Sequence, residues 1–332
     1  MNNAPHRPYV MIVGTGGTIA SSGSGTVDYH NYKVSSTVEQ ILSSVPEVGR
    51  LAELVTDQPV NVDSFRIDNA SLLKIARSVE AAAADPEIDA VVVTHGTDTL
   101  EETAFFLHLV IRTAKPIIVV GAMRPAGSLS ADGPLNLYNA LVVATSEAAW
   151  GKGVLVVANN HVYGARDLVK RDTSAIAAIE GSKYGVIAEI CGDEVHFAHT
   201  PARPHTLDSE FVLSSIQQLP VVDIMFDHQG AGQHLYQASV AAGSKAIVVA
   251  GMGNGSLSAG ARQGAFLAHQ AGIPFIRSSR TGQGIVAPLN SDAEFGIITG
   301  GSLTPQKARI LAALAIASGK KSDEMQSIFD RY

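Results

Sequence analysis

Cysteine is almost absent from this sequence, and long apolar runs are absent too. The one cysteine, Cys191, excludes an internal disulfide framework and any metal site built from several thiolates. Because Cys191 ends an apolar stretch, "IAEIC", that resembles a strand, we expect a buried and inert thiol. No apolar run approaches the roughly 18 residues that a membrane span requires, so we expect no membrane partner.

Basic residues are also scarce. The chain has 24 lysines and arginines against 31 aspartates and glutamates, a net charge of −7, which argues against a nucleic-acid partner. Its 11 histidines are scattered without the paired spacing of a metal site, so we expect no metal and no other cofactor. The opening "MNNAPHRPYV" lacks the charged-then-apolar pattern of a secretion signal, which favours the cytoplasm; a periplasmic protein whose signal was removed is the alternative.

What the sequence does contain is an alternation of short apolar runs with helical stretches. Residues 9–14, 90–96, 116–122 and 153–159 are rich in valine and isoleucine, as strands buried on both faces are. Residues 70–86, 98–114 and 132–150 have apolar positions at helical spacing and lie between those runs. The pattern predicts an α/β fold with a doubly wound, mostly parallel sheet, and such a sheet binds ligands at the carboxyl ends of its strands.

Two domains are expected in a chain of 332 residues. The alternation lapses over residues 201–220, where prolines and polar residues mark a linker. It resumes with expected strands at 221–227, 246–255 and 274–280 and a last helix at 304–318. We therefore predict a larger N-terminal domain over residues 1–200 and a smaller C-terminal α/β domain with a parallel sheet over residues 221–332.

The first strand runs directly into a glycine turn, "GTGGTIA", which holds Thr15 and Thr18. The dinucleotide pattern G-x-G-x-x-G fails here because its third glycine falls on Ile19, and no P-loop, serine elbow or H-E-x-x-H motif is present. What remains is a hydroxyl group: Thr15 at the strand tip, facing a ligand crevice. The alternative is that these threonines only satisfy the backbone of the turn.

A second group of hydroxyls follows the strand "AVVVTHG". Thr97, Asp98 and Thr99 either open a helix as part of a capping box or face the same crevice as the first turn. His95, beside a glycine, is expected to be structural. Two such hydroxyls would suit acyl transfer, in which a threonine needs a base. Lys170 is a candidate, although an isolated lysine is usually a solvated surface charge.

Seven motifs together resemble the bacterial type II L-asparaginases, including the glutaminase-asparaginases. In chain order they are "GTGGTIA", "VVVTHGTDTLEETAFFL", "GAMRP", "SADGPLNLYNA", "RDLVK", "TPAR" and "LTPQKARILA". The resemblance covers nearly the whole chain. It implies an amidohydrolase that cleaves the side-chain amide of L-asparagine to L-aspartate and ammonia, with some activity on L-glutamine as a possibility.

The resemblance also implies roles for individual residues. Thr15 matches the nucleophile that forms an acyl-enzyme. Thr97, Asp98 and Lys170 match the second catalytic group, in which Asp98 also binds the α-ammonium group of the substrate. Ser64, in "NVDSFRID", matches the serine that holds the α-carboxylate.

A tyrosine on a mobile loop closes over the substrate in this family. Tyr32 is the favoured match here, and Tyr29 is the alternative. Serines and glycines over residues 21–26 are typical of such a lid.

Two positions depart from the family pattern. Phe65 follows Ser64 where the family has a small or amide-bearing residue. Leu289 stands where many members place a glutamate that reaches the active site of a neighbouring subunit, with the polar residues Asn290, Asp292 and Glu294 displaced from that position.

Asn254, in "GMGNGS", matches a residue that the family also sends across a subunit boundary. The resemblance therefore implies a homotetramer whose sites are shared between subunits.

Two other readings of the crevice stay open. One is an amidohydrolase that prefers glutamine or another amide, because one methylene in a pocket changes binding by only about 1–3 kcal/mol. The other is an amino-acid sensor that binds without catalysis. The presence of Thr15 with Thr97 and Lys170 speaks against a sensor, since binding alone needs no nucleophile.

Overall fold

The computed structural model describes residues 7–23, 25–182 and 184–332. Its contacts divide the chain into one unit that ends at Leu213 and a second that spans Ser214–Tyr332. The division falls inside the predicted linker, 201–220. The first part of that segment is not loose, because Arg112 donates hydrogen bonds to the carbonyls of Leu207 and Ser209 and so ties it to the first unit.

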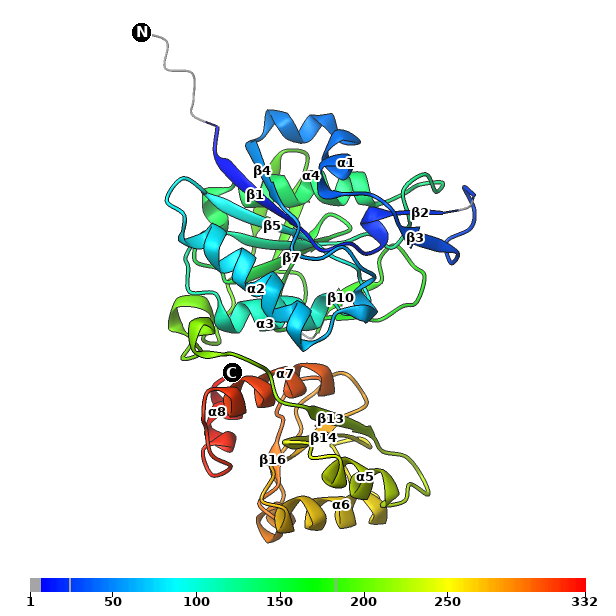
Figure 1. The fold of residues 1–332 in the computed structure, drawn as a ribbon, viewed down its shortest axis with the longest axis vertical. Coiled ribbons are helices and arrows are strands. Elements are labelled where there is room, and N and C mark those ends of the chain that lie inside the picture. Colours follow the sequence, from blue (N-terminus) through cyan, green and yellow to red (C-terminus); the bar gives the residue numbers. More distant parts are fainter. Residues whose placement is uncertain (1–6, 24, 183) are drawn as a thin grey trace. The chain divides into compact units, whose positions relative to one another are not determined.

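The first unit is built on an eight-stranded sheet of order β12-β11-β8-β7-β6-β5-β1-β4 (Figure 1). The five strands from β7 to β4 pair in parallel, and the remaining three add antiparallel pairs at one edge. The expected α/β fold with a mostly parallel sheet is confirmed. The strand bounds are β1 Tyr9–Gly14, β4 Glu53–Asp57, β5 Ala90–Thr94, β6 Ile117–Val120, β7 Val154–Ala158, β8 His161–Gly164, β11 Ala188–Cys191 and β12 Glu194–Phe197.

Helices cover both faces of this sheet (Figure 1). On one face, α1 (Val38–Ser43) and α4 (Gly133–Ala144) bury alternate residues of the central strands, among them Ile12 and Val92. On the other, α2 (Asn69–Ala84) packs on β1 and β5, and α3 (Leu100–Val110) packs on β7. Every residue of β5 and β7 is buried, which is why these strands are continuous apolar runs in the sequence.

The first unit also contains two small two-stranded sheets. β2 (Ser21–Gly23) pairs with β3 (Tyr32–Val34), and β9 (Leu168–Lys170) pairs with β10 (Ile179–Gly181), both antiparallel. The segment expected to be a lid is therefore partly an ordered hairpin.

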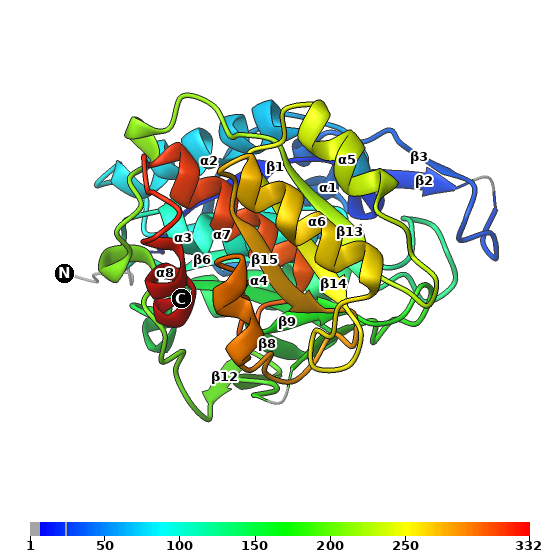
Figure 2. The same ribbon diagram turned by 90° about the horizontal axis from the view of Figure 1, so that it is seen from below.

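The second unit has a four-stranded parallel sheet of order β13-β14-β15-β16, as the sequence predicted for its smaller domain. Helices α5 and α6 pack on it and on each other, and α7 packs on β13, β14 and β15 (Figure 2). The bounds are β13 Val222–Phe226, α5 His234–Ala241, β14 Ala246–Gly251, α6 Ala259–Gln270, β15 Phe275–Ser279, β16 Ile298–Thr299, α7 Pro305–Ala317 and α8 Met325–Arg331.

Two local expectations are wrong. Cys191 is exposed, because it lies on β11, where residues alternate between buried and exposed and the odd positions face outward. The capping box at the start of α3 does not form either: the Thr99 hydroxyl donates to the carbonyl of Ser64 (2.9 Å) instead of capping the helix.

No helix among the described residues is long and apolar enough to cross a membrane.

Candidate active site

The glycine turn after β1 brings two segments of the chain into backbone contact. Gly16 and Gly17 have φ angles of 98° and 79°, which side-chain-bearing residues rarely adopt. A Cβ atom on Gly17 would lie 2.2 Å from the Cα atom of Gly96, and one on Gly96 would lie 2.7 Å from the Ser64 hydroxyl. Only glycines at both positions allow the turn after β1, the turn after β5 and the Ser64 segment to meet.

Thr15 does not present its hydroxyl to that meeting point. The residue is fully buried, and its Oγ1 donates to the carbonyl of Thr94 on the neighbouring strand (2.8 Å). Its backbone amide donates to the same carbonyl (3.1 Å). The Thr15 hydroxyl therefore serves as a further link between β1 and β5 in this structure, and its predicted place in the crevice stays a prediction.

Thr18 is the threonine with a side-chain partner from the lid. It follows Gly17 directly, and its Oγ1 donates to the hydroxyl of Tyr32 on β3 (3.1 Å). The sequence signal that could have favoured Thr18 over Thr15 is the glycine pair before it. Of the two tyrosines considered for the lid, the structure brings Tyr32 to the threonine, whereas the ring of Tyr29 lies against Arg124.

Thr97 follows Gly96 and meets the lysine that the sequence singled out. The Lys170 Nζ, at the end of β9, donates to Thr97 Oγ1 (2.9 Å) and to Asp98 Oδ1 (2.7 Å). The Lys170 side chain is 18% exposed and that of Asp98 is 52% exposed, so the ammonium is held while the carboxylate still reaches solvent. Lys170 is thus not a free surface charge.

His95 lies directly beneath this turn and is fully buried. One ring nitrogen, Nδ1, bonds to the carbonyl of Gly96 (2.8 Å), and Nε2 has no partner among the described residues. Burial lowers the pKa of His95 to about 4, so the imidazole is neutral at pH 7. It supports the turn and carries no charge into the site, in agreement with the structural role expected for it.

The sequence and the fold both match known proteins. The asparaginase N-terminal domain family matches residues 9–203, and the glutaminase/asparaginase C-terminal domain family matches residues 221–329. The chain belongs to the asparaginase family.

Its relatives in that family are similar over nearly their whole length. L-asparaginase 2 of Bacillus subtilis (strain 168) is 42% identical over 326 residues, which cover 98% of this chain and 87% of that protein. Glutaminase-asparaginase of Pseudomonas fluorescens biotype A is 39% identical over 327 residues, 97% of this chain and 90% of that protein. The crystal structure of a probable cytoplasmic L-asparaginase from Campylobacter jejuni superimposes with a TM-score of 0.95 at 35% identity and covers 98% and 100% of the two chains.

The second unit of this asparaginase holds Asn254 and the segment around Leu289. Asn254 accepts a hydrogen bond at its side-chain oxygen from the amide of Ala287 (3.0 Å). It lines a hollow of about 320 Å³ with seven others: Gly253, Ser279, Thr281, Gln283, Gly284, Ile285 and Val286.

Both acids near Leu289 have ion-pair partners within the chain. Asp292 is buried and pairs with Arg277 (2.6 Å), and Glu294 pairs with Arg262 (3.0 Å). Leu289 itself is 45% exposed. Asn290 is the remaining polar residue of this group, and Leu289 itself supplies no carboxylate.

Phe65 is 65% exposed, with the guanidinium of Arg66 over its ring (5.8 Å). Its neighbour Ser64 is buried against Gly96. The structure therefore brings Ser64 to the meeting point of the two turns and leaves the Phe65 side chain open to solvent.

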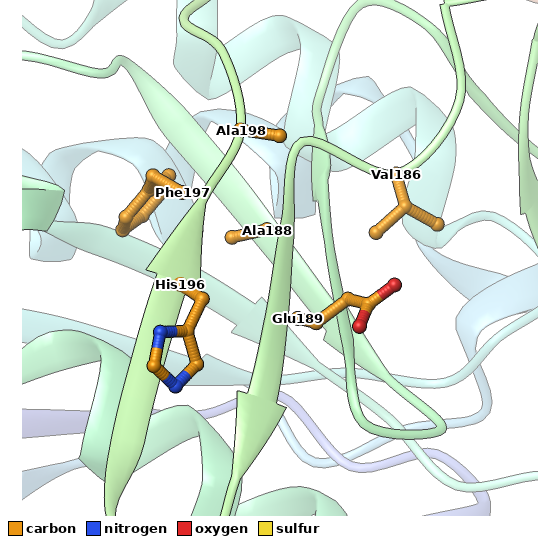
Figure 3. A pocket seen from close by; sticks show the side chains of 6 residues that line it. All are labelled: Val186, Ala188, Glu189, His196, Phe197 and Ala198. Carbon is orange, nitrogen blue, oxygen red and sulfur yellow. The ribbon is translucent and has the colours of Figure 1, made fainter.

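A further hollow, of about 360 Å³, lies on the β11–β12 hairpin (Figure 3). Six sheet positions separate β12 from β1 in the strand order, roughly 29 Å at the usual strand spacing. None of the predicted site residues lines this hollow, whose residues are Val186, Ala188, Glu189, His196, Phe197 and Ala198. No group of three metal-ligating side chains occurs in the described part of the chain.

Proposed function

We propose that this chain is an L-asparaginase that hydrolyses the side-chain amide of L-asparagine through a threonine ester, with Thr18 as the nucleophile. One observation carries the proposal. The backbone contact between Gly17 and Gly96 brings together Thr18, which bonds to Tyr32, and Thr97, which bonds to Lys170. The names of the relatives, L-asparaginase 2 and glutaminase-asparaginase, support this substrate class.

In the first half-reaction, Thr18 Oγ1 attacks the carboxamide carbon and its proton leaves through the hydroxyl of Tyr32. The C–N bond then breaks, and a proton passes from the Tyr32 hydroxyl to the departing nitrogen, which leaves as ammonia. In the second half-reaction, a water held by Thr97 attacks the ester carbon and gives up a proton to Thr97 Oγ1, which Lys170 Nζ holds in place. The bond between that carbon and Thr18 Oγ1 breaks, a proton passes from Thr97 Oγ1 to Thr18 Oγ1, and aspartate leaves, so the enzyme ends as it began.

Substrate recognition follows from the charges near the two threonines. Asparagine carries an α-ammonium group, for which the exposed carboxylate of Asp98 is the available counter-charge. Ser64 lies buried against Gly96, close to this turn, which supports a role for it in holding the α-carboxylate. Because Leu289 supplies no carboxylate at the position of the family glutamate, recognition of the ammonium group rests more heavily on Asp98, and we expect a KM for asparagine above the micromolar range.

Glutamine is the second candidate substrate, because relatives of both names match this chain to a similar degree. One extra methylene changes binding by about 1–3 kcal/mol, which is a 10- to 200-fold preference. Comparing kcat/KM for the two amides measures that preference. We propose the cytoplasm as the compartment, after the Campylobacter jejuni neighbour, with the periplasm as the alternative; cell fractionation separates the two.

The test of the nucleophile compares variants of Thr18 and Thr15 in an ammonia-release assay. T18A should lose at least about 10³-fold in kcat, because no ester can form. T18S keeps a hydroxyl and should retain measurable activity. T15A should keep most of its kcat while losing thermal stability, since it removes only a buried hydrogen bond worth about 1 kcal/mol.

The opposite pattern, an active T18A with an inactive and stably folded T15A, would return the role to Thr15. Asparagine binding without ammonia release in the unmodified protein would favour the sensor.

A further inference from the structure

We propose that Tyr29 and Arg124 form a latch that holds the lid in place and so positions Tyr32 on Thr18. The lid is defined here as residues 21–23 and 25–34, which include β2 and β3. The inference rests on the proposed function, because it assigns a purpose to the contact between Tyr32 and Thr18. Tyr29 and Arg124 touch neither threonine in this scheme and are positioning residues.

The latch itself is a contact between a cation and an aromatic face. The guanidinium carbon of Arg124 lies 4.9 Å from the centroid of the Tyr29 ring, well within the range of attraction. Arg124 Nη1 also donates to the carbonyls of Leu129 (3.1 Å) and Ser130 (3.3 Å), which fixes the plane of the guanidinium. Its Nε is buried without a hydrogen-bond partner among the described residues, so the ring face is a major partner of this group.

A row of backbone contacts accompanies the latch. The amide of Ala126 donates to the carbonyl of Ser21 (2.9 Å), and the amide of Leu129 donates to that of Thr26 (2.8 Å). The lid is therefore joined to residues 126–129 at Ser21 and at Thr26. The contact between Tyr29 and Arg124 adds a side-chain interaction to these two backbone hydrogen bonds.

The surface that receives the lid is itself anchored near Thr97. The buried carboxylate of Asp132 accepts hydrogen bonds from the amides of Met123 and Arg124, both at 2.9 Å. Gly121, where this loop starts, packs so closely that a Cβ there would lie 3.1 Å from Thr97 Cγ2. Arg124 is thus fixed relative to the second threonine, and a lid held by Arg124 is fixed relative to it as well.

A tight turn transmits the position of Tyr29 to Tyr32. Asp28 Oδ1 accepts hydrogen bonds from the amides of His30 (3.0 Å) and Asn31 (3.1 Å). The side chain of Asn31 donates to the other carboxylate oxygen of Asp28 (3.0 Å). Because residues 28–31 form one bonded turn, a ring held at position 29 restrains the hydroxyl at position 32.

The experiment compares Y29L, which removes the ring, with Y29F, which keeps it. In Y29L, kcat/KM for asparagine should fall about 5- to 20-fold, mostly through kcat, because the lid spends less time with Tyr32 on Thr18. Amide hydrogen exchange over residues 21–34 should become at least about fivefold faster. Y29F should match the unmodified protein in both measurements, and both variants should melt within about 2 °C of it, since the lid lies outside the core. R124M should repeat the effects of Y29L.

Unchanged exchange and unchanged kcat in Y29L would overturn the latch. So would a Y29F variant as impaired as Y29L, because the phenolic hydroxyl rather than the ring would then carry the effect. Failure of the proposed function is a separate result: it would appear as an unmodified protein that releases no ammonia, while hydrogen exchange would still report whether Tyr29 holds the lid.

Discussion

At the scale of single residues, the fold keeps the side chain of His95 uncharged. Its imidazole is fully buried, with a pKa lowered to about 4 against an ordinary value near 6.5. The folded protein therefore keeps His95 neutral at a pH where the unfolded chain would protonate it. Burial also lowers the pKa of His205, so this residue too favours the neutral imidazole in the folded protein.

This difference predicts how stability depends on pH. Between about pH 6.5 and 4, the unfolded state binds more protons than the folded state at position 95, so the free energy of unfolding falls as the pH falls. Relative to low pH, the contribution of His95 to the free energy of unfolding is complete above pH 6.5 and is on the order of 3 kcal/mol. Urea unfolding of the unmodified protein and of H95Q at pH 7.5 and 4.5 measures it: H95Q should be less stable at pH 7.5 and should lose less on acidification.

The exposed His30 provides the control, because H30Q should keep the full pH dependence. A loss on acidification that is the same in H95Q and in the unmodified protein would show that His95 is not its source.

Thr15 and Thr18 show why the sequence could not assign the nucleophile. Both threonines stand beside glycines in one turn, and the resemblance to the family favoured Thr15. Gly16 and Gly17 have positive φ angles, so the chain turns sharply between the two threonines. As a result the Thr15 hydroxyl bonds to Thr94 and the Thr18 hydroxyl bonds to Tyr32, a difference that the sequence does not reveal. Lys170 was different: alone it resembled a solvated surface lysine, and only the resemblance of "RDLVK" to the family implied the partnership with Thr97 that its hydrogen bond now supports.

At the scale of elements, a buried ion pair organises one surface of the second unit. Arg277 on β15 and Asp292 are both buried, and Arg277 also donates to the carbonyls of Asn254 and Ala287. Asp292 in turn accepts a hydrogen bond from the amide of Leu289 (2.8 Å). One guanidinium and one carboxylate therefore hold the Asn254 turn and the 287–292 segment together.

We predict that D292N destabilises the second unit by about 3–5 kcal/mol, because removing one partner leaves the Arg277 charge buried and uncompensated. Denaturant unfolding followed by circular dichroism measures the change. The matched control is E294Q, which breaks the exposed pair with Arg262 and should cost less than about 1 kcal/mol. Equal effects of the two substitutions would contradict a special role for the buried pair.

The elements themselves were well predicted where packing determines them, and less well at their ends. The buried strands β1, β5, β6 and β7 match their predicted runs because a strand covered on both faces must be apolar throughout. The helix predicted for 98–114 is shorter, Leu100–Val110, since Asp98 and Thr99 bond elsewhere instead of capping it. Cys191 was misplaced because apolar neighbours do not reveal which face of a strand covered on one side only each residue occupies.

At the scale of the whole molecule, we propose that the chain assembles as a homotetramer in which Asn254 of one copy completes the site of another. The prediction is complementation between T18A and N254A. N254A should raise the KM for asparagine about tenfold or more, and each variant alone should be impaired. Co-expressed, they should form mixed oligomers in which about a quarter of the sites combine an intact Thr18 with an intact Asn254 from the partner.

Light scattering on the purified mixture gives the oligomeric state, and the two variants purified separately and mixed without exchange are the control. A mixed tetramer with no recovered activity would mean that each site is complete within one chain.

The Arg277–Asp292 pair has a consequence for how such an assembly would form. Asn254 is already hydrogen-bonded to Ala287 and Arg277 within one chain. A newly made subunit would therefore present Asn254 to a neighbouring site in its final conformation. Docking would then have to align two rigid faces without ordering a loose loop, so less conformational entropy would oppose association. A subunit without the Arg277–Asp292 pair could still fold, but it would have to order the Asn254 turn during association.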